Sequence, residues 1–170
     1  MAEDLGVIDK KFDTLLEGCY RKYDWDSLNP FQIGKYAEYY AKMEFTFFRF
    51  DVFTPEIDDK GIDFIAKKNK IFFEIQVKSV RSLNYVFMQK DKFEIDNENL
   101  FLVLLIFSNN KMPEMFLIPA KTWKTPNELF VSREYKPEQK SKPEYGINLS
   151  KKNMDKLSEY IFENKIQELL

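Results

Sequence analysis

The chain has 170 residues, a net charge of −2 and no histidine, and 16% of its residues are aromatic. This length suits one domain with a sizeable hydrophobic core, and a composition of 44% hydrophobic and 32% charged residues excludes a disordered chain. The absence of histidine excludes Ser-His-Asp and Cys-His catalysis, a histidine general base and histidine-ligated metals. Any chemistry must therefore use carboxylates, lysines, tyrosines or a metal bound through oxygen, and Mg²⁺ or Mn²⁺ fits that inventory best.

Three further features narrow the class of protein. A single cysteine, Cys19, excludes an internal disulfide and a cysteine-rich zinc site, and we expect it to be a free buried thiol. The first residues lack the basic segment and apolar run of a signal peptide, and the longest apolar run, 100–107, is too short to span a bilayer. We therefore expect a cytoplasmic location and no membrane association. The acidic pI near 5.4 argues mildly against a general nucleic-acid binder.

Helical patterns dominate the first part of the chain. Apolar residues at helical spacing predict an amphipathic helix from about Lys10 to Tyr23. A second helical pattern follows Pro30, with an apolar stripe that continues to about Met43. The aromatic run Phe45–Phe50 is rich in residues that favour strands, so it predicts the first strand.

Strand patterns dominate the middle of the chain. Gly61 permits a tight entry into a strand at 62–67, and a turn at 67–70 predicts a hairpin with a strand at 71–78. Extended segments follow at 85–89 and 114–119, and the apolar run 100–107 is typical of a strand buried on both faces. Residues 120–124 predict one helical turn and 136–146 a surface loop, and Ser150 is a good N-cap for a closing helix.

Polar side chains interrupt the first hairpin where apolar ones are expected. Asp63 opens its first strand, and Glu74, Gln76 and Lys78 alternate along its second strand. Alternation places these three on one face, and the other face carries only apolar side chains: Phe73, Ile75 and Val77. A buried polar group without a partner costs about 2–7 kcal/mol. These groups must therefore satisfy one another or hold a ligand.

Three segments, Gly34–Glu38, Gly61–Asp63 and Glu74–Ser79, together resemble a known nuclease pattern. The chain is similar over residues 30–120 to the PD-(D/E)XK, or restriction-endonuclease-like, nuclease superfamily. Within it, the likeness is to archaeal Holliday-junction resolvase-like proteins and to an uncharacterised bacterial family with a Gly-Ile-Asp…Gln-Val-Lys signature. The resemblance implies a single α/β domain (1–170) with a mixed central β-sheet flanked by helices. A nuclease-like core at 30–120 would lie between an N-terminal helical extension at 1–29 and a C-terminal helix at 150–168.

The resemblance also implies roles for individual residues. Glu38 and Asp63 would be metal ligands, Gln76 would occupy the second acidic position of the motif, and Lys78 would position or activate the attacking water. Gln76 departs from the pattern because its amide can ligate Mg²⁺ but carries no charge. Glu74 could supply that charge or pair with a lysine instead.

Each of these residues also has an ordinary structural explanation. Glu38, Gln76 and Lys78 could be solvated side chains, and Asp63 could close a turn. The neighbouring acidic residues Asp58 and Asp59 are better explained as part of a solvated loop than as ligands.

Basic residues form two groups that could contact phosphates. The first contains Lys67, Lys68 and Lys70 at the hairpin tip, followed by Arg81, Lys90 and Lys92. The second contains Arg133, Lys136, Lys140 and Lys142, interleaved with Tyr135 and Tyr145, whose rings could stack on unpaired bases. The alternative for both groups is ordinary solvated surface.

The sequence thus predicts a Mg²⁺-dependent DNA endonuclease or phosphodiesterase, with branched or single-stranded DNA among its expected substrates. One alternative is a catalytically inactive nuclease-fold protein that binds nucleic acid or a protein partner. Another is a partner-binding domain that uses its many aromatic side chains, for which an exposed aromatic patch away from Asp63 would be evidence. A homodimer is also expected, because related folds often present two sites to DNA.

Overall fold

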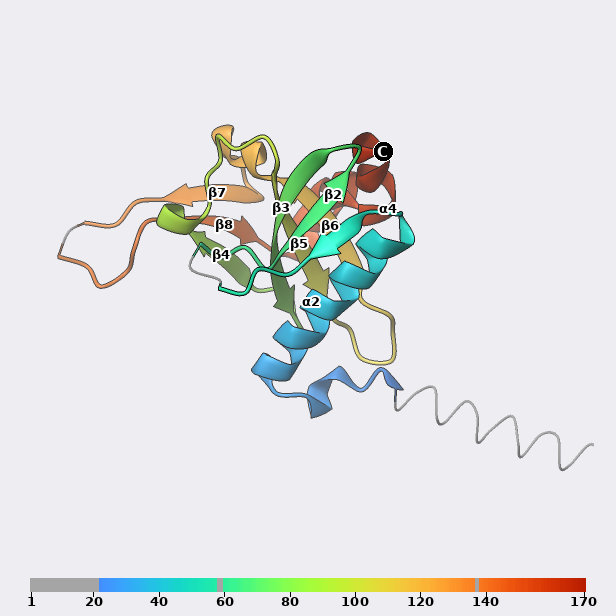
Figure 1. Ribbon diagram of the computed structural model, residues 1–170. Helices are drawn as coiled ribbons and strands as arrows, with labels where there is room; N and C mark the ends of the chain where they lie inside the picture. Colours follow the sequence, from blue (N-terminus) through green and yellow to red (C-terminus); the bar gives the residue numbers. More distant parts are fainter. Residues whose placement is uncertain (1–21, 58–59, 137) are drawn as a thin grey trace, which may run out of the picture.

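The computed structural model describes residues 22–57, 60–136 and 138–170. Within these residues, the strands form a five-stranded sheet in the order β1-β2-β3-β5-β6 and a three-stranded sheet in the order β4-β8-β7 (Figure 1). The strands of the central sheet are β1 (Asp51–Phe53), β2 (Phe64–Lys68), β3 (Ile71–Val80), β5 (Leu100–Ile106) and β6 (Glu114–Pro119). Those of the second sheet are β4 (Tyr85–Gln89), β7 (Phe130–Arg133) and β8 (Glu144–Asn148).

The central sheet is mixed, because β3 and β5 are parallel whereas its other neighbouring strands are antiparallel. Every residue of β5 is buried, as its continuous apolar sequence predicts. The predicted α/β domain with a mixed central sheet is thus confirmed, whereas the second, antiparallel sheet was not expected.

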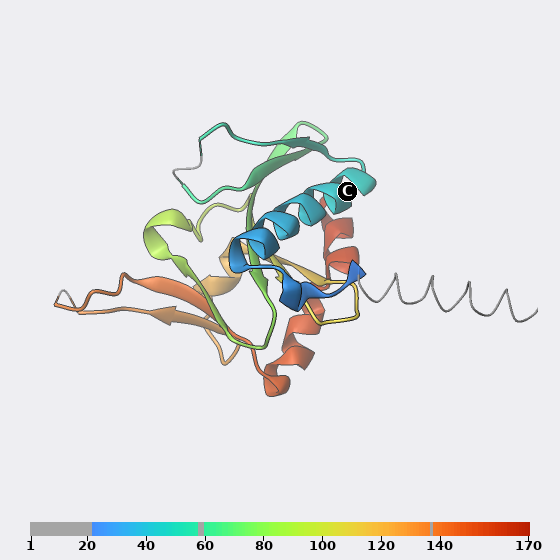
Figure 2. The same cartoon turned by 90° about the horizontal axis from the view of Figure 1, so that it is seen from below.

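Two hydrophobic cores lie on opposite faces of the central sheet. The first contains Phe73, Ile75 and Val77 of β3 together with the buried stripe of helix α2 (Pro30–Phe47). The second contains Leu100, Leu102 and Leu104 of β5 and is covered by the three-stranded sheet. Figure 2 shows α2 along the central sheet and the β7–β8 loop extending away from the body.

Helix α2 is longer than its sequence suggests, and the strand predicted at 45–50 is wrong. Asn29 and Gln32 form a capping box at its start, where Pro30 occupies the first turn. Phe45 continues the buried stripe of Ile33 and Ala41, so packing in the first core overrides the β-propensity of this aromatic run. The helix ends before Arg49, whose φ of 63° is left-handed, and β1 begins only at Asp51.

The predicted hairpin is confirmed. Asn69 and Lys70 connect β2 to β3 with φ values of 49° and 71°. Two positive φ values characterise the type I′ turn, whose twist matches that of antiparallel strands. The turn therefore fixes the register that pairs Phe64 with Ile75.

The segment after Ser150 is broken into short helices and is not one closing helix. They are η4 (Lys151–Asn153), α3 (Met154–Leu157), η5 (Ser158–Tyr160), α4 (Phe162–Lys165) and η6 (Ile166–Leu169), where η denotes a 3₁₀ helix. Ile161 interrupts the series with extended backbone and pairs with Phe116 at the edge of β6. Leu157 lies in the second core whereas Phe162 lies in the first, so the chain bends to pass around this sheet edge. Within the described residues, the Ser150 side chain makes no capping bond.

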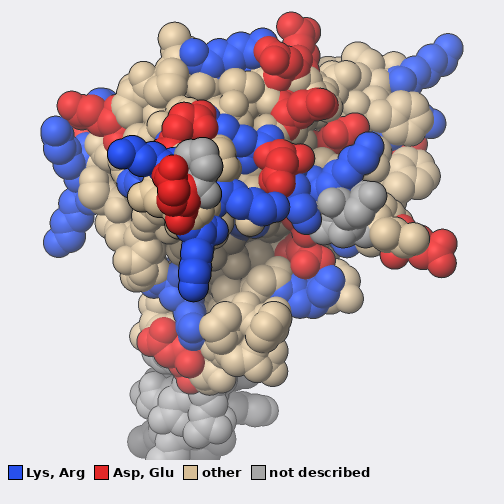
Figure 3. Space-filling view, turned by 90° about the vertical axis from the view of Figure 1, so that its left-hand side faces the viewer, with Lys and Arg blue, Asp and Glu red and all other residues tan. Residues whose placement is uncertain are grey.

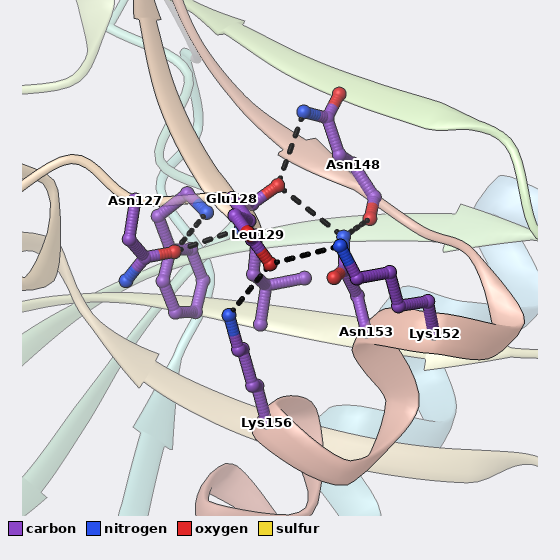
Figure 4. A network of polar contacts seen from close by, with 8 residues as sticks. Asn127, Glu128, Leu129, Asn148, Lys152, Asn153 and Lys156 are labelled. Atoms are coloured by element: carbon purple, nitrogen blue, oxygen red, sulfur yellow. Dashed lines mark hydrogen bonds and ion pairs between the residues drawn. The ribbon is translucent and has the colours of Figure 1, made fainter.

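Polar contacts hold the second sheet to this C-terminal segment (Figure 4). The Glu128 carbonyl accepts bonds from the side chains of Asn148 and Asn153 at 3.2 Å each. The Glu128 carboxylate pairs with Lys152 and Lys156, which hold its pKa below the ordinary value, Lys156 chiefly through a hydrogen bond.

The surface loop predicted at 136–146 is wrong at its end, because strand β8 begins at Glu144.

In the described ranges before the C-terminal segment, the 3₁₀ helices are η1 (Trp25–Ser27), η2 (Lys90–Lys92) and η3 (Ala120–Lys124), the last where a helical turn is predicted. Among the described residues, no helix is both long and apolar enough to cross a membrane. The predicted helix at 10–23, Cys19, Asp58 and Asp59 lie outside the described residues, apart from the last two positions of the helix.

Candidate functional site

Asp63 lies where the chain crosses from one face of the central sheet to the other. Its predecessor Ile62 packs against the second core, whereas its successor Phe64 is buried in the first. The Asp63 N–H donates to the Ile75 carbonyl at 2.9 Å, and its carboxylate accepts the Val77 N–H at 2.6 Å. The carboxylate thus continues the β2–β3 ladder and is fixed beside the two residues that flank Val77, which are Gln76 and Lys78.

Gln76 is the most buried member of the predicted site, with 6% of its surface exposed. Its Oε1 atom is buried and accepts no hydrogen bond from any described residue. Its Nε2 atom lies 2.6 Å from where a Cβ on Gly61 would be. Gly61 has a φ of 76°, so both the backbone conformation and this close approach require glycine there.

Lys78 and Glu74 share the face of β3 that carries Gln76. They pair in register with Leu104 and Leu100, which belong to the second core, so the predicted alternation is confirmed. Across the described part of the chain, the Lys78 ammonium has no hydrogen bond or ion pair. Glu74 accepts a bond from Asn97 Nδ2 at 3.2 Å.

Glu74 also lines a cleft of about 400 Å³. Lys60, Lys90 and Lys92 contribute cationic side chains to the same cleft. Lys92 Cβ lies 3.8 Å from the Cβ position at Gly61, which connects the cleft to the Gln76 amide. The sequence alone could not indicate this cleft, because η2 reaches β3 only through the tertiary fold.

Glu38 lies on α2, which packs in the first core, on the face of the central sheet opposite to Gln76. It accepts a hydrogen bond from Lys35 Nζ at 2.5 Å. This bond, the Glu38 charge and the charge of Asp63 all raise the pKa of Lys35. Lys35 therefore lies within electrostatic reach of Asp63, and it already partners Glu38, the predicted second carboxylate.

The donor set can be tested against a hard divalent cation. Carboxylate and amide oxygens suit Mg²⁺, and the buried Gln76 Oε1 is an acceptor without a hydrogen bond from the described residues. Among the residues described, no three acidic, cysteine or histidine side chains cluster in a way that could hold a metal. The donor types of Asp63, Glu38 and Gln76 are therefore those that Mg²⁺ prefers.

Two of the residues predicted to contact nucleic acid are engaged inside the fold. Lys68 Nζ donates to the carbonyls of Phe48 and Arg49, at 3.0 and 3.1 Å, and so caps the end of α2. Arg81 Nη1 donates to the Leu28 carbonyl at 2.8 Å and holds the segment before α2.

Lys67 and Lys70, from the same predicted group, lie at the hairpin. Lys67 Nζ lies 5.5 Å from the centre of the Phe72 ring, and Lys70 is exposed at the turn. The tip at Lys68 lies five residues beyond Asp63, which is about 17 Å along a strand. On the face shown in Figure 3, basic and acidic side chains are interleaved, and neither charge forms a continuous band.

No protein-family model matches the sequence. No curated protein matches it either. Among solved structures, the chain is similar to a Holliday junction resolvase from the archaeal hyperthermophile Archaeoglobus fulgidus, with 12% identity over 68% of this chain and 83% of that one and a TM-score of 0.44. It is also similar to a bacterial homing endonuclease, with 18% identity over 66% of this chain and 82% of that one and a TM-score of 0.43.

Proposed function

We propose that the protein is a divalent-metal-dependent phosphodiester hydrolase that acts on DNA, with a Gln-X-Lys variant of the nuclease motif. The observation that carries this proposal is the buried Gln76 Oε1, which accepts no hydrogen bond from the described residues and lies on the strand that Asp63 caps. Burying an amide oxygen without a partner is costly, and a bound cation would remove that cost.

Asp63, Glu38 and the Gln76 amide would hold Mg²⁺ or Mn²⁺, and Glu74 is a fourth candidate ligand. The bound metal would lower the pKa of water and neutralise charge on the scissile phosphate. Lys78 would hold the attacking water in line, because its ammonium has no competing ion pair among the described residues. Asp63 has a second role, since its bond to Val77 keeps the strand in register.

A cleavage assay tests the proposal. Wild type, Asp63→Asn and Lys78→Met are incubated with branched, single-stranded and duplex DNA in Mg²⁺, Mn²⁺ or EDTA. Asparagine can still accept the Val77 N–H, so Asp63→Asn removes charge with little effect on the fold. Lys151→Met, at an exposed position on η4 and outside both basic groups, is the matched control for Lys78→Met. We expect metal-dependent cleavage by wild type and the control, and a loss of at least 100-fold in both site variants, of the order that positioned acid–base groups contribute. Equal inertness of wild type and Asp63→Asn on every substrate would contradict an enzyme.

The second candidate function is binding without cleavage. It is favoured by the neutral Gln76 and by the ion pair that Glu38 already makes with Lys35. Titrating Mg²⁺ by calorimetry separates the two functions. A hydrolase requires a metal site that Asp63→Asn weakens, whereas a binding protein need show no heat that depends on this residue. The expected homodimer stays a prediction, which sedimentation at several protein concentrations can test.

A further inference from the structure

The outer face of the second sheet carries flat side chains that no part of the candidate site uses. Val86, Met88 and Ile147 point into the second core. Alternation therefore turns Tyr85 and Phe87 of β4 to the opposite face. Arg133 of β7 lies on the same outer face. It pairs in register with Glu144, which shares a face of β8 with Gly146, the partner of Phe87.

Tyr85 is held in place by the strand next to it. Its hydroxyl donates to Glu144 Oε1 at 2.8 Å, and a Cβ on Gly146 would lie only 2.1 Å from that hydroxyl. The ring therefore reaches along β8 over the space that a side chain at Gly146 would fill. Glu144 is buried and also accepts the Tyr135 hydroxyl at 3.0 Å. Burial and the Glu144 bond raise the pKa of Tyr85, so the hydroxyl stays a neutral donor.

Two flat groups next to Tyr85 are open to solvent. The Phe87 ring is inclined by only 16° to the Tyr85 ring, with centroids 6.5 Å apart, and Phe87 is 49% exposed. The Arg133 guanidinium carbon lies 3.9 Å from the Tyr85 ring centroid, and the Arg133 side chain is 45% exposed. Aromatic rings and guanidinium planes are the groups on which proteins stack unpaired nucleobases.

The charge around these groups suits a phosphate backbone. Glu144 is buried and bonded, and Glu134 is paired with Lys90. Lys136 and Lys140 of the β7–β8 loop have no ion pair within the described part of the chain, and Glu138 is the one acid among residues 136 and 138–142. The exposed loop is therefore net positive.

The chain leads directly from the second sheet to the cleft that Glu74 lines. Strand β4 runs at Gln89 directly into η2, whose Lys90 and Lys92 line the cleft beside Glu74. A DNA strand that follows β4 along this sheet would therefore reach the cleft at Lys90 and Lys92.

We propose that this face binds single-stranded DNA, with one unpaired base stacked on Phe87 and a neighbouring base on the Arg133 guanidinium. Glu144 and Tyr85 act as positioning residues for Arg133, and the lysines of the β7–β8 loop contact phosphates. The inference rests on the proposed function in that it names the substrate class, DNA with an unpaired strand, for the same cleft.

Fluorescence anisotropy with labelled oligothymidine of about 15 nucleotides, the upper size of one such binding site, tests the proposal in EDTA. EDTA removes any contribution of a metal to binding. We expect Phe87→Ala to weaken binding by about 5- to 100-fold, the range measured when a stacking residue is truncated. Arg133→Lys keeps the charge but loses the plane, so it should also weaken binding at constant salt. Phe47→Ala, whose ring is 79% exposed on α2, is the matched control and should bind as wild type.

The outcomes distinguish this inference from the proposed function. If Phe87→Ala and Arg133→Lys are folded and bind oligothymidine as wild type does, or if wild type itself does not bind, the stacking face is wrong even where metal-dependent cleavage is found. If both variants lose binding while Asp63→Asn retains it, the face is supported even where no cleavage is found. Thermal unfolding of each variant shows that a loss of binding is not a loss of fold, and Arg133→Lys serves alone should Phe87→Ala not fold.

Discussion

Because the Gln76 Oε1 atom is buried without a hydrogen bond from the described residues, we expect Gln76 to lower the free energy of unfolding of the metal-free protein. Gln76 is 6% exposed, and its Oε1 atom accepts no hydrogen bond from the described residues. An unsatisfied buried acceptor costs about 1–3 kcal/mol. Methionine has a side chain of similar length without a strong polar atom, so Gln76→Met should raise the free energy of unfolding in EDTA by about 1–3 kcal/mol. For a chain of this size, each kcal/mol raises Tm by roughly 2–4 °C.

Metal should reduce or reverse the difference in stability between Gln76→Met and wild type. A ligand at 100 times its Kd stabilises the folded state by about 2.7 kcal/mol. Wild type should gain this stability in Mg²⁺, whereas Gln76→Met, with one donor fewer, should gain much less. Urea denaturation in EDTA and in Mg²⁺ measures both effects in one series.

Asn153 offers the control for this experiment. Its Oδ1 atom is also buried without a hydrogen bond from the described residues, but its Nδ2 atom donates to the carbonyls of Glu128 and Asn148. Asn153→Leu should therefore lower stability, by about 1–3 kcal/mol for two lost bonds. A Gln76→Met protein that is less stable than wild type in EDTA, or that gains the same stability from Mg²⁺, would refute the reasoning.

Three other predictions follow from single contacts. Lys68→Met should lower the free energy of unfolding by about 1–2 kcal/mol, because two carbonyls at the end of α2 lose their donor, whereas Lys67→Met should be near neutral; urea denaturation compares them. Lys35→Met should tighten Mg²⁺ binding by about fivefold, the equivalent of a surface ion pair near 1 kcal/mol that a metal no longer displaces, and weaker binding by calorimetry would show that Lys35 supports the site instead. Burial raises the pKa of Tyr40 from 10.0 to about 12, so its contribution to stability is complete below pH 10 and is lost as the pH rises toward 12. Denaturation midpoints measured between pH 9 and 11 should fall less steeply for Tyr40→Phe than for wild type.

Local patterns predicted the elements whose structure depends on near neighbours. The hairpin at Asn69, the buried strand β5 and the polar alternation of β3 all follow from adjacent residues, and the structure contains each of them. The strand predicted at 45–50 was wrong because an aromatic residue such as Phe45 suits a strand or a buried helix equally, and packing in the first core decides between them. The single closing helix predicted after Ser150 was wrong for a related reason, because the break at Ile161 depends on its pairing with Phe116 at the edge of β6.

The candidate site also has features that the sequence shows and features that only the folded chain creates. Asp63, Gln76 and Lys78 could be proposed as site residues because their types and their spacing on two adjacent strands are visible in the sequence. The engagement of Lys68 and Arg81 could not be predicted, because their acceptors are backbone carbonyls 19 to 56 residues away. The sequence could not predict that Lys60 lines the cleft beside Glu74 either, because only the folded chain brings these residues together.

The bond between the Asp63 carboxylate and the Val77 N–H has a consequence for recognising proteins of this kind. An aspartate at the start of β2 completes the ladder with β3, so folding alone gives a reason to keep it after any chemistry has been lost. Lys78 has no such bond among the described residues, and the buried Gln76 Oε1, which accepts no hydrogen bond from them, lowers the free energy of unfolding. In a set of similar chains, loss of the lysine and replacement of the glutamine by an apolar residue would therefore mark those that no longer cut, while the aspartate would mark only the shared fold.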